Sequence, residues 1–292
     1  MEKRDVLKRY LAYDANVRVI VTNVTKMVSD ARNIHSLSNV ATASLGRVLI
    51  ASTMMSSKLK DIDNRITVKL KGDGPLGSIV VCGNKSLKMK GYVANPSVNL
   101  PLKPNGKLDV SKAVGKGDLT VIKDIGLKEP YIGCSKIISG EIAEDFAYYF
   151  VTSEQTPCAI ALGVNITKDN TVGMAAGYII EPLPDCDEKI IDVIEKITTN
   201  ISSITNLMLD LGNIDDVAKT ISGDNNIKCI DEEYPVYECD CSSKRIERVI
   251  IALGKNEAIN TLEKNNGILE ISCNFCNKVY RFNKNEVENL FK

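Results

Sequence analysis

The sequence predicts an α+β protein with three parts: an N-terminal mixed α/β domain built on a largely antiparallel sheet, a helical linker, and a small C-terminal domain that carries four cysteines. Strand-like segments follow one another without helices between them in the first part, which favours antiparallel pairing. Apolar residues then recur at helical spacing, and paired cysteines come after them. A chain of 292 residues is also longer than one small core usually organises. We place the three parts at residues 1–180, 181–231 and 232–292.

The N-terminal domain combines alternating β-branched runs with one long apolar run. Residues Val17–Val24 alternate and are rich in β-branched side chains, which predicts a strand. Ser38 is a suitable N-cap for a helix that continues to residue 59, and its small residues and methionines predict burial. Ser139 is expected to cap a further helix over residues 140–150. Other strands are expected at residues 66–70, 78–82, 87–93, 158–164 and 171–180.

The linker opens with two prolines in residues 181–188, which interrupt regular structure. Apolar residues then follow in steps of three and four, and this spacing describes one face of a long amphipathic helix that ends at Gly212. A shorter helix is expected over residues 214–221. The linker is acidic and residues 1–180 are basic, so the two could dock, although two separately solvated surfaces are the alternative. The apolar positions are Ile190, Ile194, Ile197, Ile201, Ile204, Met208 and Leu211.

The C-terminal domain is small and has its own pattern. Ser242 or Ser243 is expected to cap a helix that Gly254 ends, and a second short helix is expected to end near Gly267. A domain of about sixty residues has a thin core and usually needs a disulfide or a metal to hold it. Two strands and a last helix are expected at residues 268–272, 279–282 and 285–291.

Two closely spaced cysteine pairs in this domain predict a zinc site. Cys239 and Cys241 are separated by one residue, and Cys273 and Cys276 by two. Zinc takes four tetrahedral ligands, and a CxxC loop between two strand-like segments commonly supplies two of them. The CxC loop is tighter, but both of its sulfurs can reach one metal. We therefore predict one zinc ion per chain on these four cysteines.

The chemistry of four thiolates leaves two roles open for this zinc. It could be a permanent strut that couples metal binding to folding. It could also be a redox switch, because zinc holds the sulfurs as thiolates, which are the oxidisable form, and paired thiolates condense to disulfides. The apolar face of the linker leaves similar alternatives: a permanently packed helix, or a surface buried in one state and adhesive in another.

Several functional classes find no support in the sequence. Four thiolates leave no open metal position, and the only histidine, His35, lies far away in sequence and is expected to be a capping or surface residue, so we predict no enzymatic activity. The C-terminal segment has no basic stripe that would favour nucleic acid. No apolar tract is long enough to span a membrane, and charges interrupt the N-terminus where a signal peptide needs an apolar core, so a cytoplasmic location is expected.

Several motifs together resemble one family. ECDCSSKRIERVIIALG followed by CNFCNKVYRF resembles the zinc domain of the 33 kDa heat-shock chaperonins, the redox-regulated chaperones of bacteria. The N-terminal motifs VATASLGRVLIA, KGDGPLGSIV, LDVSKAVGKGDLTVIKDIGLKEPY and SGEIAEDFAYYFVTSEQTPCAIALGV match it in the expected order. The resemblance therefore covers nearly the whole chain.

The resemblance implies an ATP-independent holdase that protects unfolding and oxidatively damaged proteins from aggregation. It implies that zinc on the four cysteines keeps the reduced protein inactive, and that oxidation forms Cys239–Cys241 and Cys273–Cys276 disulfides, releases zinc and loosens the linker. The active form is implied to be a dimer through the N-terminal domain, which binds clients, while the C-terminal domain is the switch. The alternative is a constitutive zinc-stabilised binding module for an acidic partner or nucleic acid. Cys186 and Cys229 have no assigned role.

Overall fold

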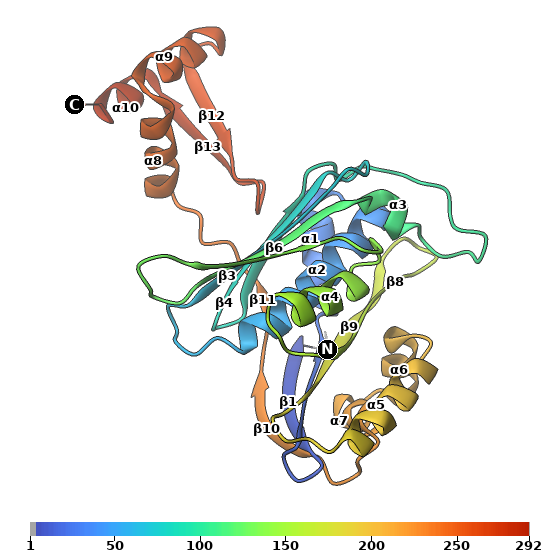
Figure 1. Cartoon of the computed structure of the whole chain (residues 1–292). Helices are drawn as coiled ribbons and strands as arrows, with labels where there is room; N and C mark the ends of the chain where they lie inside the picture. Colours follow the sequence, from blue (N-terminus) through green and yellow to red (C-terminus); the bar gives the residue numbers. More distant parts are fainter. Residues whose placement is uncertain (1–3, 292) are drawn as a thin grey trace. The chain divides into compact units, whose positions relative to one another are not determined.

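The computed structural model of the chain describes residues 4–291 (Figure 1). Its contacts divide the chain into two compact units, Met1–Tyr237 and Glu238–Lys292. The predicted α+β class is confirmed, because both units combine helices with antiparallel strand pairs. Within the described part of the chain, no helix is both long and apolar enough to cross a lipid bilayer.

The first sheet of the N-terminal unit has, in residues 4–291, five antiparallel strands in the order β10-β1-β2-β9-β8. The strand predicted over Val17–Val24 is confirmed as β2. It is buried on both faces, with Val19 and Val21 in one apolar cluster and Ile20 in the other, which explains its nearly continuous apolar run. The strands are β1 (Val6–Ala12), β2 (Val17–Asn23), β8 (Ala159–Ile166), β9 (Val172–Pro182) and β10 (Lys228–Glu233).

The second sheet has six strands within the same residues, in the order β11-β5-β4-β3-β6-β7. Its central pairs are antiparallel, as the succession of strands predicts, and only the short β11 runs parallel to its neighbour β5. Alternation along β3 buries Ile66, Val68 and Leu70 on the inner face. The strands are β3 (Arg65–Gly72), β4 (Ser78–Asn84), β5 (Lys88–Val93), β6 (Gly117–Asp124), β7 (Tyr131–Lys136) and β11 (Val236–Tyr237).

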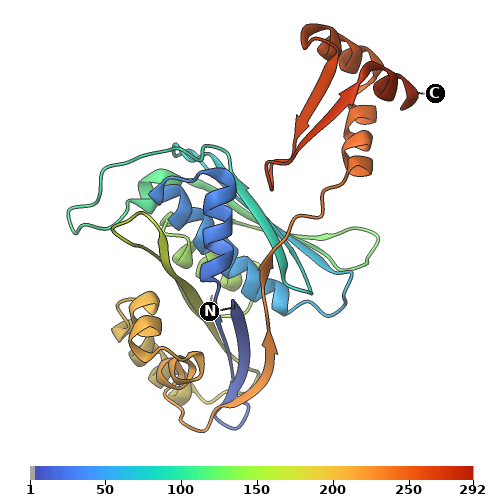
Figure 2. The same ribbon diagram turned by 180° about the vertical axis from the view of Figure 1, so that it is seen from behind.

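Helix α2 (Asn39–Ser57) packs against strands of both sheets and is buried along nearly its whole length. Ser38 caps it as predicted, since the Ser38 hydroxyl accepts a hydrogen bond from the Ala41 N–H at 3.3 Å. Small residues let the strands approach closely: a Cβ on Gly46 would lie 2.7 Å from a methyl of Val164. Helix α1 (Thr25–His35) lies beside α2 and is seen in Figure 2.

The prediction of one long helix in the linker is wrong. The segment forms α5 (Glu188–Asn200), α6 (Ile204–Leu211) and α7 (Ile214–Ser222). The chain becomes extended at Ile201, and the Ser203 side chain then caps α6. Apolar spacing continues across this break because the apolar faces of all three helices join one cluster with the first sheet, in which α6 and α7 contact the strands and α5 packs against α7. The buried apolar positions that these helices contribute to the cluster are Ile194, Ile204, Met208, Ile214, Val217, Ala218 and Ile221.

The linker therefore packs within the N-terminal unit in this structure. Its helices cover the face of β2 and β9 opposite α2, against Tyr10, Val19 and Ala176. Strand β10 then adds to the edge of β1. The division between the compact units falls after Tyr237, six residues beyond the predicted start of the C-terminal part at residue 232.

Helix α4 (Ala143–Thr152) begins differently from the prediction, because Ser139 does not cap it. The capping group is the fully buried Asp145 carboxylate, which accepts hydrogen bonds from four backbone N–H groups that precede or begin the helix. This cap also supports Ile142, a β-branched residue whose φ of 72° lies in the left-handed region. The donors are Ile138 (2.8 Å), Ser139 (2.9 Å), Gly140 (3.3 Å) and Ile142 (2.9 Å). The short helix α3 (Val110–Val114) completes this part of the unit.

The C-terminal unit packs three helices around one hairpin within residues 238–291. Ser242 caps α8 through a hydrogen bond from the Arg245 N–H, and Gly254 ends the helix, both as predicted. Its core is small and joins Ile250, Leu262 and Val287 to the cysteine cluster. The elements are α8 (Ser243–Leu253), α9 (Lys255–Lys264), β12 (Ile268–Ser272), β13 (Val279–Asn283) and α10 (Lys284–Asn289).

Candidate metal centre

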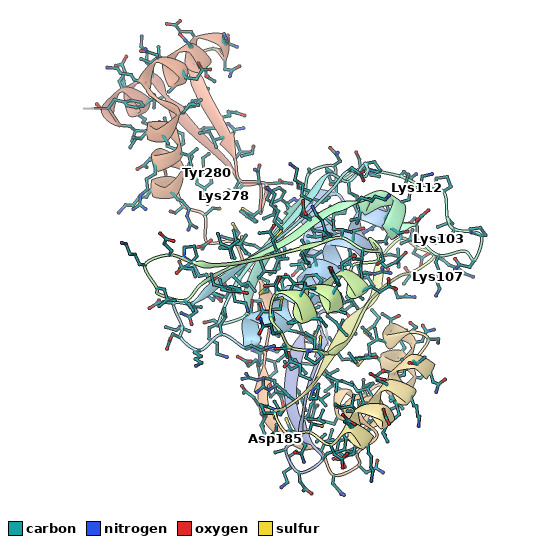
Figure 3. The ribbon with its side chains drawn as sticks, in the orientation of Figure 1. Lys103, Lys107, Lys112, Asp185, Lys278 and Tyr280 are labelled. Carbon is teal, nitrogen blue, oxygen red and sulfur yellow. The ribbon has the colours of Figure 1, made fainter. Side chains whose placement is uncertain are left out.

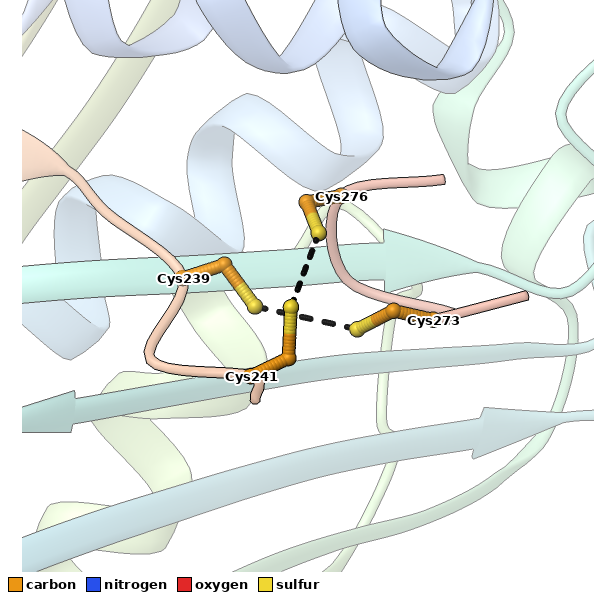
Figure 4. Close-up of side chains that lie close together, drawn as sticks. All are labelled: Cys239, Cys241, Cys273 and Cys276. Atoms are coloured by element: carbon orange, nitrogen blue, oxygen red, sulfur yellow. Dashed lines mark hydrogen bonds between the residues drawn. The ribbon is translucent and has the colours of Figure 1, made fainter. Parts of the chain in front are cut away.

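Two loops of the C-terminal unit position the four predicted cysteines. Cys239 and Cys241 lie in the extended segment that leads into α8, and Cys273 and Cys276 lie in the turn between β12 and β13. Figure 4 shows the four side chains converging from these two loops. Residues separated by more than thirty positions in the sequence are thus brought into one cluster, as the spacing predicts.

The turn that carries Cys273 and Cys276 folds back on itself through backbone hydrogen bonds. The Cys273 N–H donates to the Lys278 carbonyl at 3.0 Å, and the Asn277 N–H donates to the Cys273 carbonyl at 2.8 Å. Asn277 has a φ of 57°, in the left-handed region that asparagine tolerates better than most residues. The tight turn directs both thiols to the same side of the hairpin.

The four sulfurs are spaced as one metal ion requires. All four Sγ atoms lie within 4.8 Å of one another. The Sγ atoms of Cys239 and Cys273 are 3.7 Å apart, and those of Cys241 and Cys276 are 3.4 Å apart. Zinc–sulfur bonds of about 2.3 Å in a tetrahedron separate the sulfurs by roughly 3.8 Å. The set therefore fits a four-coordinate zinc ion.

A tyrosine that the cysteine spacings do not predict completes the cluster. The Tyr280 hydroxyl donates a hydrogen bond to the Cys241 sulfur at 3.1 Å. Lys278 lies over the same ring, 5.1 Å from its centroid, and Figure 3 labels both residues. Tyr280 comes four residues after Cys276 on β13, where alternation turns it toward the cysteines. That alternation is the signal that could have identified it.

The surroundings of the cysteines shift their pKa values in opposite directions. Burial works to raise the pKa of Cys241, but the hydrogen bond from Tyr280 and those from the other thiols outweigh it and lower the pKa to about 7. Burial raises the pKa of Cys239 and also that of Cys276. The hydrogen bond to Cys241 raises the pKa of Tyr280 to about 12. The protein therefore favours the thiolate form at Cys241 more than at Cys239 or Cys276.

Replacing Tyr280 with phenylalanine is expected to weaken zinc binding about 10- to 100-fold, the range for loss of an outer-shell partner of a metal ligand. The ring and its packing remain, so the effect reports the hydroxyl alone. Competition with a chromogenic chelator measures the affinity. Tyr234→Phe is the matched control, because its hydroxyl bonds to Glu232 in the other unit. Equal affinities for Tyr280→Phe and wild type would show that this hydrogen bond does not tune the site.

The cluster is suited to holding a metal and not to activating water. Four thiolates complete a tetrahedral shell, with no position left for a substrate or a water molecule. His35, the only histidine, lies in the other unit, where it is buried and its Nε2 is 3.1 Å from the Tyr237 hydroxyl. The expectation that His35 is a capping or surface residue is therefore wrong.

The remaining five cysteines lie outside this cluster, and among the described residues only the four cysteines above form a group that could hold a metal. Cys82 and Cys158 are half-buried on or beside strands, and burial raises the pKa of Cys158 to about 12, which keeps it a neutral thiol. Cys134 on β7 is exposed. Cys186 is half-buried at the start of the linker, and Cys229 is exposed on β10.

Comparison with known proteins agrees with the architecture of both units. The family model for Hsp33 protein matches residues 5–283. The 33 kDa chaperonin of Caldanaerobacter subterraneus subsp. tengcongensis is 45% identical over 289 residues, which cover 99% of this chain and 98% of the relative. The 33 kDa chaperonin of Clostridium perfringens strain SM101 is 41% identical over 290 residues, covering 99% of this chain and 92% of the relative.

A solved structure gives the same result in three dimensions. The crystal structure of the 33 kDa chaperonin (heat shock protein 33 homolog) from Thermotoga maritima superposes with a TM-score of 0.90 at 34% identity. The match covers 98% of this chain and 97% of that one. With a family model over nearly the whole chain and relatives above 40% identity, the chain belongs to the Hsp33 family of 33 kDa chaperonins, and it is a chaperone.

Proposed function

We propose that this chaperone is a redox-regulated, ATP-independent holdase, kept inactive by zinc on Cys239, Cys241, Cys273 and Cys276. The observation that carries the proposal is the closed cluster of four sulfurs within 4.8 Å, joined to a small apolar core. When bound, zinc would cross-link the two cysteine pairs and hold the sulfurs as thiolates. A unit of this size depends on such a cross-link for its fold.

Oxidation of the cysteines is the proposed signal. In each pair, two thiolates give up two electrons to one molecule of hydrogen peroxide and form a sulfur–sulfur bond. The peroxide takes up two protons and becomes two molecules of water. Disulfides no longer offer thiolate ligands, so the C-terminal unit loses the metal and its fold.

The oxidised protein is expected to contain Cys239–Cys241 and Cys273–Cys276 disulfides. The sulfurs that lie nearest in the reduced arrangement belong to different pairs, Cys239 with Cys273 and Cys241 with Cys276. Peptide mapping by mass spectrometry without reduction therefore separates the predicted pattern from the other two pairings that four cysteines allow. Once the metal is gone, each short loop keeps its own two thiols together, which favours the predicted pattern. Recovery of cross-linked 239–273 and 241–276 peptides instead would contradict it.

We place the client-binding surface on the N-terminal domain, where the linker helices pack against the first sheet. These helices bury apolar residues against the first sheet, among them Ile194, Met208 and Val217. Helix α6 also presents Leu209 and Leu211 to solvent. Loosening the linker would expose the buried stripe and the sheet face beneath it, both suited to unfolded polypeptide. We further propose that the active form is a cytoplasmic homodimer formed through the N-terminal domain.

The test is suppression of aggregation of a thermally unfolding protein, measured by light scattering without nucleotide. The reduced, zinc-loaded protein should leave aggregation unchanged, and peroxide-treated protein should suppress it. Subsequent reduction with zinc present should restore the inactive form. Equal protection by the reduced and oxidised proteins would support a constitutive binding module and contradict the switch.

A further inference from the structure

Residues 228–237, here called the strap, pair with one edge of each sheet of the N-terminal unit. Strand β10 pairs antiparallel with β1 from Leu7 to Leu11. Strand β11 then pairs parallel with β5 at Lys88 and Met89. Figures 1 and 2 show this segment running from the edge of one sheet to the other. Without the strap, β1 and β5 would each present unpaired backbone groups, the usual template for adding a strand.

Three consecutive acidic residues of the strap meet basic residues of the N-terminal unit. Arg9 forms ion pairs with both Asp231 and Glu233. Lys85 lies 3.1 Å from the Glu233 carboxylate. The pair that Glu232 forms with Lys8 is longer, at 3.4 Å. These contacts set the position of the strap by charge as well as by backbone pairing.

The two cationic side chains that bind Glu233 also donate hydrogen bonds to the backbone of the N-terminal unit. Arg9 Nη1 donates to the Ser57 carbonyl at 2.9 Å, and Lys85 Nζ donates to the same carbonyl at 3.1 Å. Ser57 is the last residue of α2, so both cations also lie at the negative end of that helix. Their side chains are only about one-fifth exposed, with values of 20% and 21%. They therefore form a preorganised carboxylate site.

A tyrosine fixes the other end of the strap. The Tyr237 hydroxyl donates to the Gly91 carbonyl at 2.7 Å and accepts from the Gly91 N–H at 3.2 Å. His35 Nε2 lies 3.1 Å from the same oxygen. The Tyr237 ring packs against the apolar cluster that contains α2. The strap thus has two anchors: a carboxylate on Arg9 and Lys85, and a tyrosine on Gly91 and His35.

We propose that the surface beneath the strap is a binding site for an extended acidic segment of another polypeptide, with the strap as its intramolecular occupant. The segment that fits has carboxylates at strand spacing followed by a tyrosine, as in the strap itself. It would pair with β1 and β5 by strand addition and place a carboxylate on Arg9 and Lys85. The inference rests on the proposed function in one respect: the strap is continuous with the cysteine unit that begins at Glu238, and the proposed unfolding of that unit is the event to which we assign its release.

The test weakens the strap of the full-length protein and leaves the site intact. In reductant, Asp231→Asn/Glu233→Gln should bind a fluorescent peptide of residues 228–237, with serine at position 229, at least tenfold more tightly than wild type. Fluorescence anisotropy measures binding. A control peptide that carries Asp231→Asn, Glu232→Gln and Glu233→Gln should bind the same protein at least tenfold more weakly, a comparison that does not depend on the folding of further variants.

Matched charge changes locate the site. Adding Arg9→Gln/Lys85→Gln to the weakened-strap protein should reduce peptide binding at least tenfold. Adding Lys107→Gln/Lys112→Gln should leave peptide binding unchanged, because Lys107 precedes α3 and Lys112 lies within it (Figure 3). The proposal is overturned if the weakened-strap protein binds no better than wild type, or if it dimerises by light scattering and excludes the peptide, since a second copy would then fill the site.

A parallel aggregation assay separates this inference from the proposed function. If oxidised wild-type protein suppresses aggregation while the weakened-strap protein binds no peptide, the inference fails alone. If the weakened-strap protein binds the acidic peptide while oxidised protein gives no protection, the site stands and the redox-switched holdase fails.

Discussion

Replacing Cys273 with serine is expected to abolish tight zinc binding and to unfold residues 238–292 even in reductant. Cys273 is the most buried of the four cysteines, with 8% of its surface exposed, and it belongs to the apolar core of its unit. A hydroxyl does not replace a thiolate as a zinc ligand. The loss should exceed about 100-fold in affinity, because even outer-shell partners of a metal ligand contribute 10- to 100-fold. Structural zinc contributes roughly 10–16 kcal/mol to coupled folding, so the small core should not survive its loss.

Chelator competition and hydrogen exchange measure the two effects on the same sample. Amides of residues 238–292 should lose protection, while those of β2, β9 and α2 keep theirs. Cys134→Ser is the matched control, because it removes an exposed thiol on β7 and leaves the cluster complete. Wild-type zinc affinity in Cys273→Ser would remove Cys273 from the ligand set.

Replacing Asp145 with alanine is expected to destabilise the N-terminal unit by about 3 kcal/mol or more. Its fully buried carboxylate accepts hydrogen bonds from four backbone N–H groups, at Ile138, Ser139, Gly140 and Ile142. Each buried donor left without a partner costs roughly 1–3 kcal/mol. The left-handed backbone at Ile142 would also lose its support. Urea unfolding of the reduced protein measures the change in the free energy of unfolding.

Two variants define the cause of that loss. Asp145→Asn keeps one accepting oxygen and should lie between alanine and wild type. Asp109→Ala removes the cap of α3, a single N–H bond from Lys112 at 3.1 Å, and should cost about 1 kcal/mol, as for an ordinary N-cap. If Asp145→Ala cost no more than Asp109→Ala, the four hydrogen bonds would not act as the geometry indicates.

Local patterns predict most of the elements of this fold because their signals are short-range. The cap at Ser38, the β-branched run in β2 and the cysteine spacings each depend on a few neighbouring residues. The same reasoning brings the four cysteines together from their spacing alone, since one tetrahedral ion satisfies both pairs.

The features that the sequence did not predict depend on distant partners. Spacing alone does not distinguish one helix from two that share a sheet face, so the break at Ile201 was missed. Asp145 caps α4 from inside the helix, whereas the position of Ser139 suggested a cap ahead of the helix. The strap was missed because its partners, β1 and β5, lie more than 140 residues away in sequence, and backbone pairing leaves little trace in composition.

Loss of zinc from the four cysteines is expected to activate the chaperone. Zinc release and client protection should therefore be measured together while the protein is titrated with peroxide. Peroxide should release one zinc ion per chain, and protection should rise in proportion to the zinc released, with both absent in reductant. Full zinc release that leaves client aggregation unchanged, or full protection with zinc still bound, would contradict activation by zinc loss.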